Sequence, residues 1–344
     1  MPVRISSEDL DHIASSLDDV IPHIAGKRFF ITGGTGFFGK WILETLLFLN
    51  EKHDTNCSAA VLTRNAEKFK QHYSQFDDSA IEYVTGYIKN FPFPEGKFHY
   101  CIHAAMEGEN LDKTDELEVL NAAYSGTTRV LEFVKQKNIQ STLYVSSGGV
   151  YGRQPPEVRH MPEDNANAPD TMQLRSCYGE GKRVGEFLCA YYGRKFELPV
   201  KIVRPFAFVG PYLALDAHFV IGNFIKNRLA DEPILIKGDG TPIRSYMYAA
   251  DLAIYLFKVL IHGENLTPYN LGSSEEVSIV SLAHLIANMS GPKLDITVLQ
   301  KNDRQGLPER YVPDVTRIET RFPAINTISM TDAIARTLAF YTQK

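Results

Sequence analysis

The sequence predicts a doubly wound α/β fold, in which one parallel sheet is covered by helices on both faces. Short, β-rich apolar runs alternate with longer helical patterns through the first half of the chain, as crossover connections between parallel strands require. A glycine-rich turn joins the first of these runs to the first long helical pattern. The 344 residues are 44% hydrophobic and 22% charged, which suits a folded domain with a sizeable core rather than a disordered chain.

The chain opens on a helical pattern. Ser6 and Ser7 precede two acidic residues, a sequence typical of a helix N-terminus, and apolar residues then recur at helical spacing. The acidic character and the lack of a continuous apolar stretch argue against a secretory signal. We expect an amphipathic helix that packs on the following domain through Leu10, Ile13, Ala14, Leu17 and Ile21.

Strands and helices then alternate along the chain. Apolar and β-branched runs predict parallel strands at 28–32, 59–63, 81–85, 100–103, 142–146 and 200–204. Helical patterns cover 37–50, about 116–137, and the stretch from Ser176 to about Phe196. Ligand sites in such sheets lie at the carboxyl ends of the strands, so we look for chemistry there.

A glycine-rich turn occupies the first of these strand ends. Its glycines follow a predicted strand and begin a predicted helix, in the pattern TGxxGxxG. In this context glycines form a tight turn, let the backbone approach a pyrophosphate, and allow close packing of helix on strand. We expect a dinucleotide site here, with contacts from Gly33, Thr35, Gly36, Phe37, Phe38 and Gly39.

The end of the second strand selects between NAD and NADP. An acidic residue there binds the ribose hydroxyls of NAD, whereas an arginine accommodates the 2′-phosphate of NADP. This chain has Thr63 and Arg64 and no acid at that point. Arg64 therefore favours NADP, with NAD as the alternative.

A dinucleotide site also suggests how the chain is divided. We expect a helical extension over 1–26, a dinucleotide-binding Rossmann domain over 27–205, and a mainly substrate-binding lobe over 206–344. The lobe is predicted to be a smaller, discontinuous α/β unit, because the pattern becomes less regular and rich in Gly, Pro and aromatic residues after Phe206. Part of this last segment is expected to return to the Rossmann sheet.

A tyrosine and a lysine form a second chemical pattern. Tyr178 and Lys182 are four residues apart on a predicted helix, so both project from one face. A lysine ammonium beside a phenol lowers the pKa of the phenol, which makes Tyr178 a candidate base and acid. Ser147, at the end of a predicted strand, is placed to bind the same substrate hydroxyl. Alone, the tyrosine and lysine would be a chance pair on an exposed helix.

The three motifs TGxxGxxG, SSxxVYG and YxxxK together resemble the extended short-chain dehydrogenase/reductases, in the nucleotide-sugar epimerase/dehydratase branch. The resemblance covers nearly the whole chain and implies a catalytic triad of Ser147, Tyr178 and Lys182. It implies that Tyr178 takes the proton of the sugar C4 hydroxyl while hydride passes to the nicotinamide, and that Lys182 also holds the nicotinamide ribose. Further implied cofactor positions are His103, Ala104, Ala105, Ser146, Arg204 with Pro205, and Phe206, with Asn121 as a structural helix position behind them.

The resemblance extends into the second half. The tract GNFI, with Asn223 and Phe224, resembles the segment that contacts the sugar diphosphate. The stretch LIKGDGTPIRSYMYAADL, which includes Ile236, resembles a nucleotide-binding segment in which Arg244 meets the pyrophosphate. Arg310 is a further candidate at the nucleotide, because a guanidinium pairs bidentately with phosphate oxygens. The alternative for each arginine is an ordinary solvated side chain.

Departures from the family pattern narrow the reaction. Sugar 4,6-dehydratases carry an Asp–Glu pair where this chain has Gly148 and Gly149, so dehydration is disfavoured. The local sequence around Tyr178 looks closest to that of UDP-glucuronate decarboxylases. Epimerisation at C4 needs the fewest catalytic groups, because the 4-keto sugar only has to turn over, and the two glycines would leave room for that movement. Ala207 replaces a usual asparagine, so other groups must hold the substrate; Glu107, Arg175 and His218 are candidates.

Composition sets the remaining expectations. A net charge of -5 argues against nucleic acid, and the four dispersed cysteines suggest reduced cytoplasmic thiols with no zinc site. No apolar stretch is long enough for a membrane span. An NADPH-dependent 4-keto-sugar reductase and a non-catalytic cofactor-binding regulator stay as alternatives to an epimerase or decarboxylase. The resemblance implies a nucleotide-diphosphate sugar as substrate. It also implies a homodimer with a four-helix interface, for which the apolar positions are Val184, Phe187, Leu188, Tyr191 and Tyr192.

Overall fold

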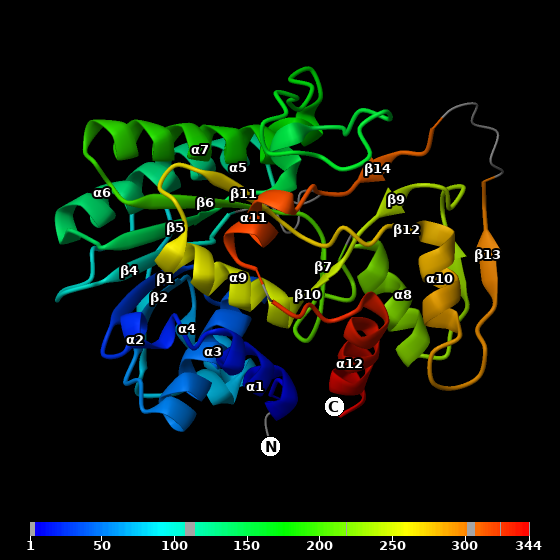
Figure 1. Cartoon of the computed structure of the whole chain (residues 1–344), viewed down its shortest axis with the longest axis horizontal. Helices are drawn as coiled ribbons and strands as arrows, with labels where there is room; N and C mark the ends of the chain where they lie inside the picture. Colours follow the sequence, from blue (N-terminus) through cyan, green and yellow to red (C-terminus); the bar gives the residue numbers. More distant parts are fainter. Residues whose placement is uncertain (1–3, 107–113, 218, 301–306, 324, 344) are drawn as a thin grey trace.

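The computed structural model describes residues 4–106, 114–217, 219–300, 307–323 and 325–343. Within these ranges, seven parallel strands form one central sheet (Figure 1), which confirms the predicted doubly wound α/β class. In spatial order the strands are β11 (Pro268–Leu271), β6 (Val200–Pro205), β5 (Ser141–Val145), β4 (Tyr100–His103), β1 (Arg28–Thr32), β2 (Ser58–Thr63) and β3 (Ile81–Thr85).

The strand order reverses between β1 and β4. The chain runs outward from β1 through β2 to β3, and then returns to β4 on the other side of β1 before continuing to β5 and β6. Connections that leave in opposite directions open a crevice at the carboxyl ends of the two central strands, which is where ligands bind in this class of sheet. The glycine-rich turn follows β1 and therefore borders this crevice.

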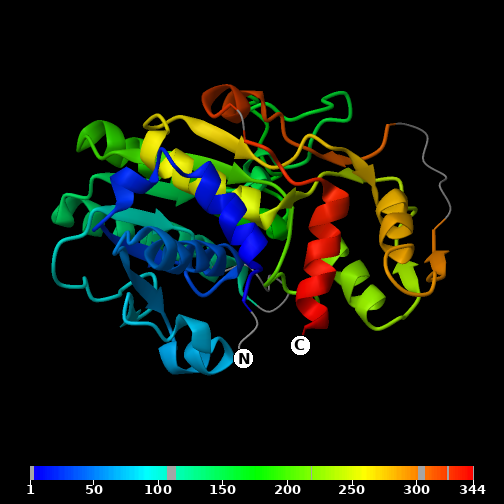
Figure 2. The same ribbon diagram turned by 60° about the horizontal axis from the view of Figure 1, so that its bottom comes forward.

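Helices cover both faces of the sheet (Figures 1 and 2). The side chains of β1 alternate between the two faces: Phe29 and Ile31 belong to one apolar core, and Phe30 to another. The first core includes residues of α1, α3 and α9, and in the second Phe133 of α6 packs on Phe30. The helices are α1 (Ser7–Ser16), α3 (Phe37–His53) and α9 (Ala249–His262) on one side, and α5 (Glu116–Asn121), α6 (Thr127–Lys137) and α7 (Cys177–Lys195) on the other.

The N-terminal helix is shorter than the sequence predicts. Ser6 caps α1 by accepting a hydrogen bond of 3.2 Å from the Asp9 amide, and the predicted stripe from Leu10 to Leu17 is buried. α1 ends at Ser16, and Ile21 instead begins a separate helix, α2 (Ile21–Ile24), with Pro22 in its first turn, where a proline is tolerated. The predicted helix over 116–137 is one run of α5, a π-helical turn (Ala122–Gly126) and α6.

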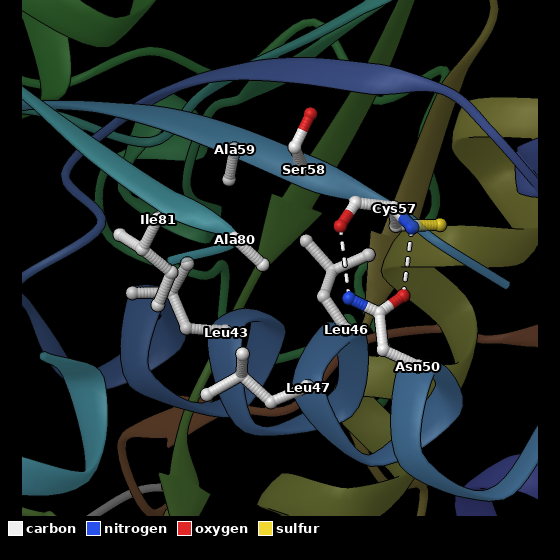
Figure 3. A pocket seen from close by; sticks show the side chains of 9 residues that line it. All are labelled: Leu43, Leu46, Leu47, Asn50, Cys57, Ser58, Ala59, Ala80 and Ile81. Atoms are coloured by element: carbon white, nitrogen blue, oxygen red, sulfur yellow. Dashed lines mark hydrogen bonds between the residues drawn. The ribbon is translucent and has the colours of Figure 1, made fainter. Parts of the chain in front are cut away.

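Apolar packing also fixes α3 against β2 and β3. Figure 3 shows a narrow crevice between them, where leucines of α3 face small and apolar residues of the strands. The Asn50 side chain closes one end, because its amide donates to Cys57 O at 2.8 Å and accepts from Cys57 N at 2.7 Å. This crevice holds none of the predicted site residues; its lining is Leu43, Leu46, Leu47, Asn50, Cys57, Ser58, Ala59, Ala80 and Ile81.

A second unit carries short strands beyond one end of the sheet (Figure 1). Within it β9 (Ile243–Arg244) pairs with both β12 (Val277–Ser278) and β14 (Arg310–Tyr311), while β8 (Ile234–Ile236) pairs with β13 (Ile296–Val298). Elsewhere in the described part of the chain, the elements not yet given are β7 (Phe208–Val209), β10 (Met247–Tyr248), α4 (Ala66–His72), α8 (Val220–Leu229), α10 (Ile279–Ala287), α11 (Thr316–Arg321), α12 (Met330–Thr342) and single turns at Ser74–Phe76, Gly148–Tyr151 and Leu174–Ser176. No described helix is long and apolar enough to cross a membrane.

Candidate active site

The glycine-rich turn packs directly on the end of β4. Gly33 has a φ of 75°, and a Cβ added there would lie 2.7 Å from the backbone of Ala104 and Ala105. A Cβ on Gly39 would lie 2.3 Å from Gly33 O. Side chains at these two positions would therefore push the turn, α3 and the end of β4 apart, which explains the glycines in structural terms.

The N-terminus of α3 fits a dinucleotide pyrophosphate. Gly36 is its N-cap residue and supplies no side-chain hydrogen bond, and the first turn contains no acidic residue. The free amide groups and the helix dipole at such an end favour an anion. Thr35, Phe37 and Phe38 are partly buried around this end, and Arg64 is exposed directly after β2.

His103 supports the same region from inside the fold. Its ring is hydrogen-bonded to Thr32 Oγ1 at 2.8 Å and to Thr127 Oγ1 at 3.1 Å, which ties β4 to β1 and α6. Burial, with a contribution from the Lys182 charge, lowers the pKa of His103 to about 3. The ring is therefore neutral, and Ala105 N completes the network by donating to Thr32 Oγ1 at 3.2 Å.

Ser147 and Tyr178 lie on either side of Gly149, just after the end of β5. Ser147 Oγ accepts a hydrogen bond of 3.0 Å from the Gly149 amide. A Cβ added to Gly149 would lie 3.3 Å from Ser147 Oγ and 3.5 Å from Cδ1 of the Tyr178 ring. The hydroxyl-bearing side chains thus face each other across a position that has no side chain of its own.

Lys182 lies behind Tyr178 on α7. It is 3% exposed, and its ammonium donates to Val145 O at 2.7 Å and lies 5.9 Å from the centre of the Tyr178 ring. Burial lowers the pKa of Lys182 to about 8, while the charge of Glu186 acts in the opposite direction. The side chain is therefore largely charged at neutral pH, close to the phenol whose ionisation it favours.

A partly buried ion pair joins α7 to the sheet. Arg204 of β6 donates to both carboxylate oxygens of Glu186, at 2.9 and 2.7 Å, and to the Tyr151 hydroxyl at 2.8 Å. Ser146 Oγ also donates to Glu186, at 2.6 Å. The side chains of Arg204 and Ser146, predicted at the cofactor, are thus engaged within the protein. Sequence reasoning missed Glu186, although it lies four residues after Lys182 on the same helix face.

The arginines predicted for the substrate come together in the second unit. Arg244 of β9 and Arg310 of β14 lie on paired strands. Each has a carboxylate partner: Arg244 donates to Glu309 at 2.9 Å, and Arg310 lies 2.9 Å from Glu276. Burial opposes ionisation of Glu276, but hydrogen bonds from Arg159 and Arg310 outweigh it and lower its pKa to about 2.

The other candidates are dispersed. Ile236 is buried in the apolar core, and the exposed Asn223 places its side-chain amide 3.1 Å from Leu215 O. Arg175 is exposed before α7 and bonds to Gln173 at 2.7 Å. Two remaining candidates, Glu107 and His218, lie outside the described residues; Asn121 is exposed at the end of α5 and Phe206 packs on Tyr311.

Known proteins resemble this chain in sequence and in fold. UDP-glucuronic acid decarboxylase 5 of Arabidopsis thaliana is 26% identical over 293 residues, 85% of this chain and 83% of the relative. UDP-glucuronic acid decarboxylase 1 of Xenopus tropicalis is 26% identical over 92% of this chain and 72% of its own length. The structure of a UDP-glucose 4-epimerase from Thermotoga maritima superposes with a TM-score of 0.77 at 18% identity, covering 92% of this chain and 99% of that chain.

A glycine-rich turn after β1 and a Ser/Tyr/Lys cluster are the features expected of an enzyme that acts with a nicotinamide cofactor. The family model described as NAD dependent epimerase/dehydratase family matches residues 29–272. The chain belongs to this family, which confirms the resemblance in its sequence.

Proposed function

We propose that this enzyme oxidises the C4 hydroxyl of a nucleotide-diphosphate sugar to a 4-keto intermediate and then reduces it again, with epimerisation at C4 as the net reaction. The observation that carries the proposal is the cluster at Gly149, where Ser147 and Tyr178 flank the glycine and the Lys182 ammonium lies 5.9 Å from the centre of the Tyr178 ring. A base, a hydroxyl donor and a cation at one point are what proton removal from an alcohol requires.

The residues divide the proton chemistry among themselves. Tyr178 Oη, as phenolate, takes the proton of the C4 hydroxyl, and the Lys182 ammonium stabilises that phenolate. Ser147 donates to the same C4 oxygen as it becomes a carbonyl. The turn from Gly33 to Gly39 would hold the dinucleotide, and a nicotinamide bound there would supply the hydride acceptor and donor for C4. Inversion requires the 4-keto sugar to turn over, so that hydride returns to the opposite face of C4. In the return step Tyr178 gives its proton back to the C4 oxygen, so the enzyme ends as it began.

The two glycines beside Ser147 support epimerisation unequally. A Cβ on Gly149 would lie 3.3 Å from Ser147 Oγ and 3.5 Å from the Tyr178 ring, so the glycine keeps the gap between these two side chains unfilled. Gly148 leaves no room, contrary to expectation, because a Cβ there would lie 2.6 Å from the Tyr311 hydroxyl and 2.9 Å from the Phe206 ring. Neither glycine transfers a proton, so the site offers no acid–base pair at 148–149 for dehydration.

Decarboxylation is the second candidate, because the relatives above are named UDP-glucuronic acid decarboxylases and align with most of the chain. Loss of carbon dioxide from a 4-keto uronic acid needs no dedicated base, so the same residues suffice. Arg64 supports NADP as the cofactor, and a reductase that uses free NADPH would share the site.

The deciding experiment starts with the purified protein, denatured so that any retained dinucleotide is identified by mass spectrometry. The protein is then incubated with UDP-glucose and with UDP-glucuronic acid, and the products are separated. A C4 epimer of either sugar supports the proposal; UDP-xylose with carbon dioxide supports the second candidate. Tyr178→Phe is the matched control and should lose about 10²–10⁴-fold in rate while it retains dinucleotide. No turnover of any sugar nucleotide, with or without added NAD and NADPH, would contradict the proposal.

We also propose a homodimer through α5 and α7, which pack together in the structure. Phe187 is 68% exposed and Leu117 is 74% exposed, whereas Leu188 and Tyr192, predicted at the interface, lie in the chain's own core. Sedimentation should show a dimer for the wild type and a monomer for Phe187→Glu. A wild-type monomer at micromolar concentration would contradict this assembly.

A further inference from the structure

A closed ring of hydrogen bonds surrounds the end of β5. Ser146, the residue after this strand, donates its amide to Val203 O at 2.8 Å and its hydroxyl to Glu186 Oε1 at 2.6 Å. Glu186 also accepts from Arg204, with Nε at 2.9 Å and Nη2 at 2.7 Å. Because Val203 and Arg204 are neighbours in β6, the ring closes and fixes the Glu186 carboxylate where α7 meets two strands.

The same strand end binds the lysine of the Ser/Tyr/Lys cluster. The Lys182 ammonium donates to the carbonyl of Val145, the last residue of β5, at 2.7 Å. Lys182 and Glu186 are four residues apart on α7, so they project from one face of the helix. The ammonium and the carboxylate therefore bind Val145 and Ser146, consecutive residues whose Cα atoms are about 3.8 Å apart. Glu186 lies one helical turn after Lys182, whereas Tyr178 lies one turn before it.

The side chains around Lys182 also include Tyr144, His103 and Cys189, and none of these three is charged at neutral pH. Burial raises the pKa of Tyr144 and of the Cys189 thiol, and it lowers the pKa of His103 to about 3. Burial also lowers the pKa of Lys182 itself to about 8, and the charge of Glu186 opposes this effect. Of these neighbours in the described part of the chain, Glu186 is the one whose charge balances the ammonium.

We propose that Glu186 is a positioning residue for Lys182, whose ammonium it keeps charged and in place beside the Tyr178 phenol. Ser146 and Arg204 hold the carboxylate where it serves the lysine. The role rests on the proposed function, because the charge of Lys182 affects the reaction only if Tyr178 acts as the base. Glu186 acts through Lys182 rather than on the sugar.

A titration of Lys182 tests the proposal without any sugar substrate. In protein labelled with ¹³C at the lysine ε-carbons, the Lys182 NMR signal is identified by its loss in Lys182→Arg, and its shift with pH gives the midpoint of ionisation. We expect the wild-type midpoint near pH 8. Glu186→Gln should lower it by about one pH unit, because a nearby negative charge is removed. Arg204→Gln should raise it, because a positive charge is removed instead.

Opposite shifts separate a charge effect from a structural one, since both variants break the same ion pair. An unchanged midpoint in Glu186→Gln, or shifts of both variants in the same direction, would overturn the proposal. Glu132→Gln is the matched control, because Glu132 accepts a hydrogen bond of 2.6 Å from Tyr192, further along α7. This control should leave the midpoint of Lys182 unchanged.

A double variant covers the case in which a single variant fails to fold. Glu186→Gln/Arg204→Gln leaves neither partner of the ion pair as an unpaired charge, so it avoids the main cost of breaking the pair. It should still lower the midpoint of Lys182, because Glu186 is the partner whose charge acts on the lysine. An unchanged midpoint in the double variant would overturn the proposal.

Rates at two pH values extend the test to catalysis. With its midpoint lowered by about one pH unit, Lys182 in Glu186→Gln is largely neutral at pH 8 and still mostly charged at pH 6.5. Relative to the wild type, kcat should therefore fall about fivefold at pH 8 and less than about twofold at pH 6.5. An equal loss at both pH values would indicate a structural role alone and overturn the proposal.

The two readouts also separate this proposal from the proposed function. Turnover of a sugar nucleotide together with an unchanged Lys182 titration in Glu186→Gln would overturn the positioning role alone. Opposite midpoint shifts in a protein that turns over no sugar nucleotide would show that Glu186 sets the charge of Lys182. In that case the proposed function, and the catalytic role that rests on it, would fail.

Discussion

The proposed cofactor side and the proposed substrate side of the site differ in what fixes their geometry. On the cofactor side the backbone sets the positions: Gly33 and Gly39 sit so close to their neighbours that no Cβ fits. On the substrate side long side chains set them, and Arg244 and Arg310 are each paired with a glutamate. The first surface is rigid before any ligand arrives. The second must exchange a carboxylate for a phosphate if the proposed substrate binds there, so its affinity depends on charge competition.

The largest effect is expected from Gly39→Ala on the backbone-built side. Its Cβ would lie 2.3 Å from Gly33 O, so the turn must shift, at a cost of about 3 kcal/mol or more in unfolding free energy. Dinucleotide content should fall with it. Chemical unfolding and mass spectrometry of the retained dinucleotide measure both effects. Gly238→Ala on the substrate side is the matched control and should match the wild type; equal losses in the two variants would break the comparison.

An intermediate effect is expected from His103 as pH falls. Its pKa is about 3 in the folded protein against 6.5 in the unfolded chain, so below about pH 6.5 the unfolded chain binds a proton that the folded protein excludes. The contribution of neutral His103 to the free energy of unfolding is therefore fully present above pH 6.5. It falls as the pH drops toward 3, by up to about 1.4 kcal/mol per pH unit. Urea unfolding at several pH values should show a shallower loss for His103→Gln, which cannot titrate. Parallel curves would contradict the role given to His103.

The smallest effect is expected from Glu309→Gln on the side built from ion pairs. Arg244 and Glu309 are partly exposed, so their pairing contributes at most about 1 kcal/mol. Releasing Arg244 should lower the KM for a nucleotide sugar by up to about fivefold, with kcat unchanged. The exposed Glu157→Gln controls for the loss of one negative charge. A higher KM in Glu309→Gln would show that the glutamate assists binding rather than competing with it.

Short sequence patterns were enough to predict the strands and the motifs on the proposed cofactor side of the site. The strands at 28–32, 81–85 and 100–103 have the predicted bounds, because apolar and β-branched runs buried on a parallel sheet carry a strong local signal. The turn from Gly33 to Gly39 and the pair Tyr178 and Lys182 are equally local, since each motif lies within one element or junction.

The remainder depends on contacts between distant segments. Tyr311 lies in a strand of two residues, which has no periodicity, and the Phe206 ring on which it packs comes from a distant part of the chain. Glu276 and Glu309 look like ordinary surface acids until the pairing of β9 with β14 brings the arginines beside them. No local pattern distinguishes Gly148 from Gly149. Only the structure shows that Gly148 lies against Tyr311, whereas Gly149 lies between Ser147 and Tyr178.

The register of β14 on β9 has a mechanical consequence. Tyr311 pairs with Arg244, so the ring that packs on Phe206 and the arginine proposed for the nucleotide are joined by one strand pair. A change in the position of Arg244 would therefore displace the ring whose hydroxyl lies against position 148, next to Ser147.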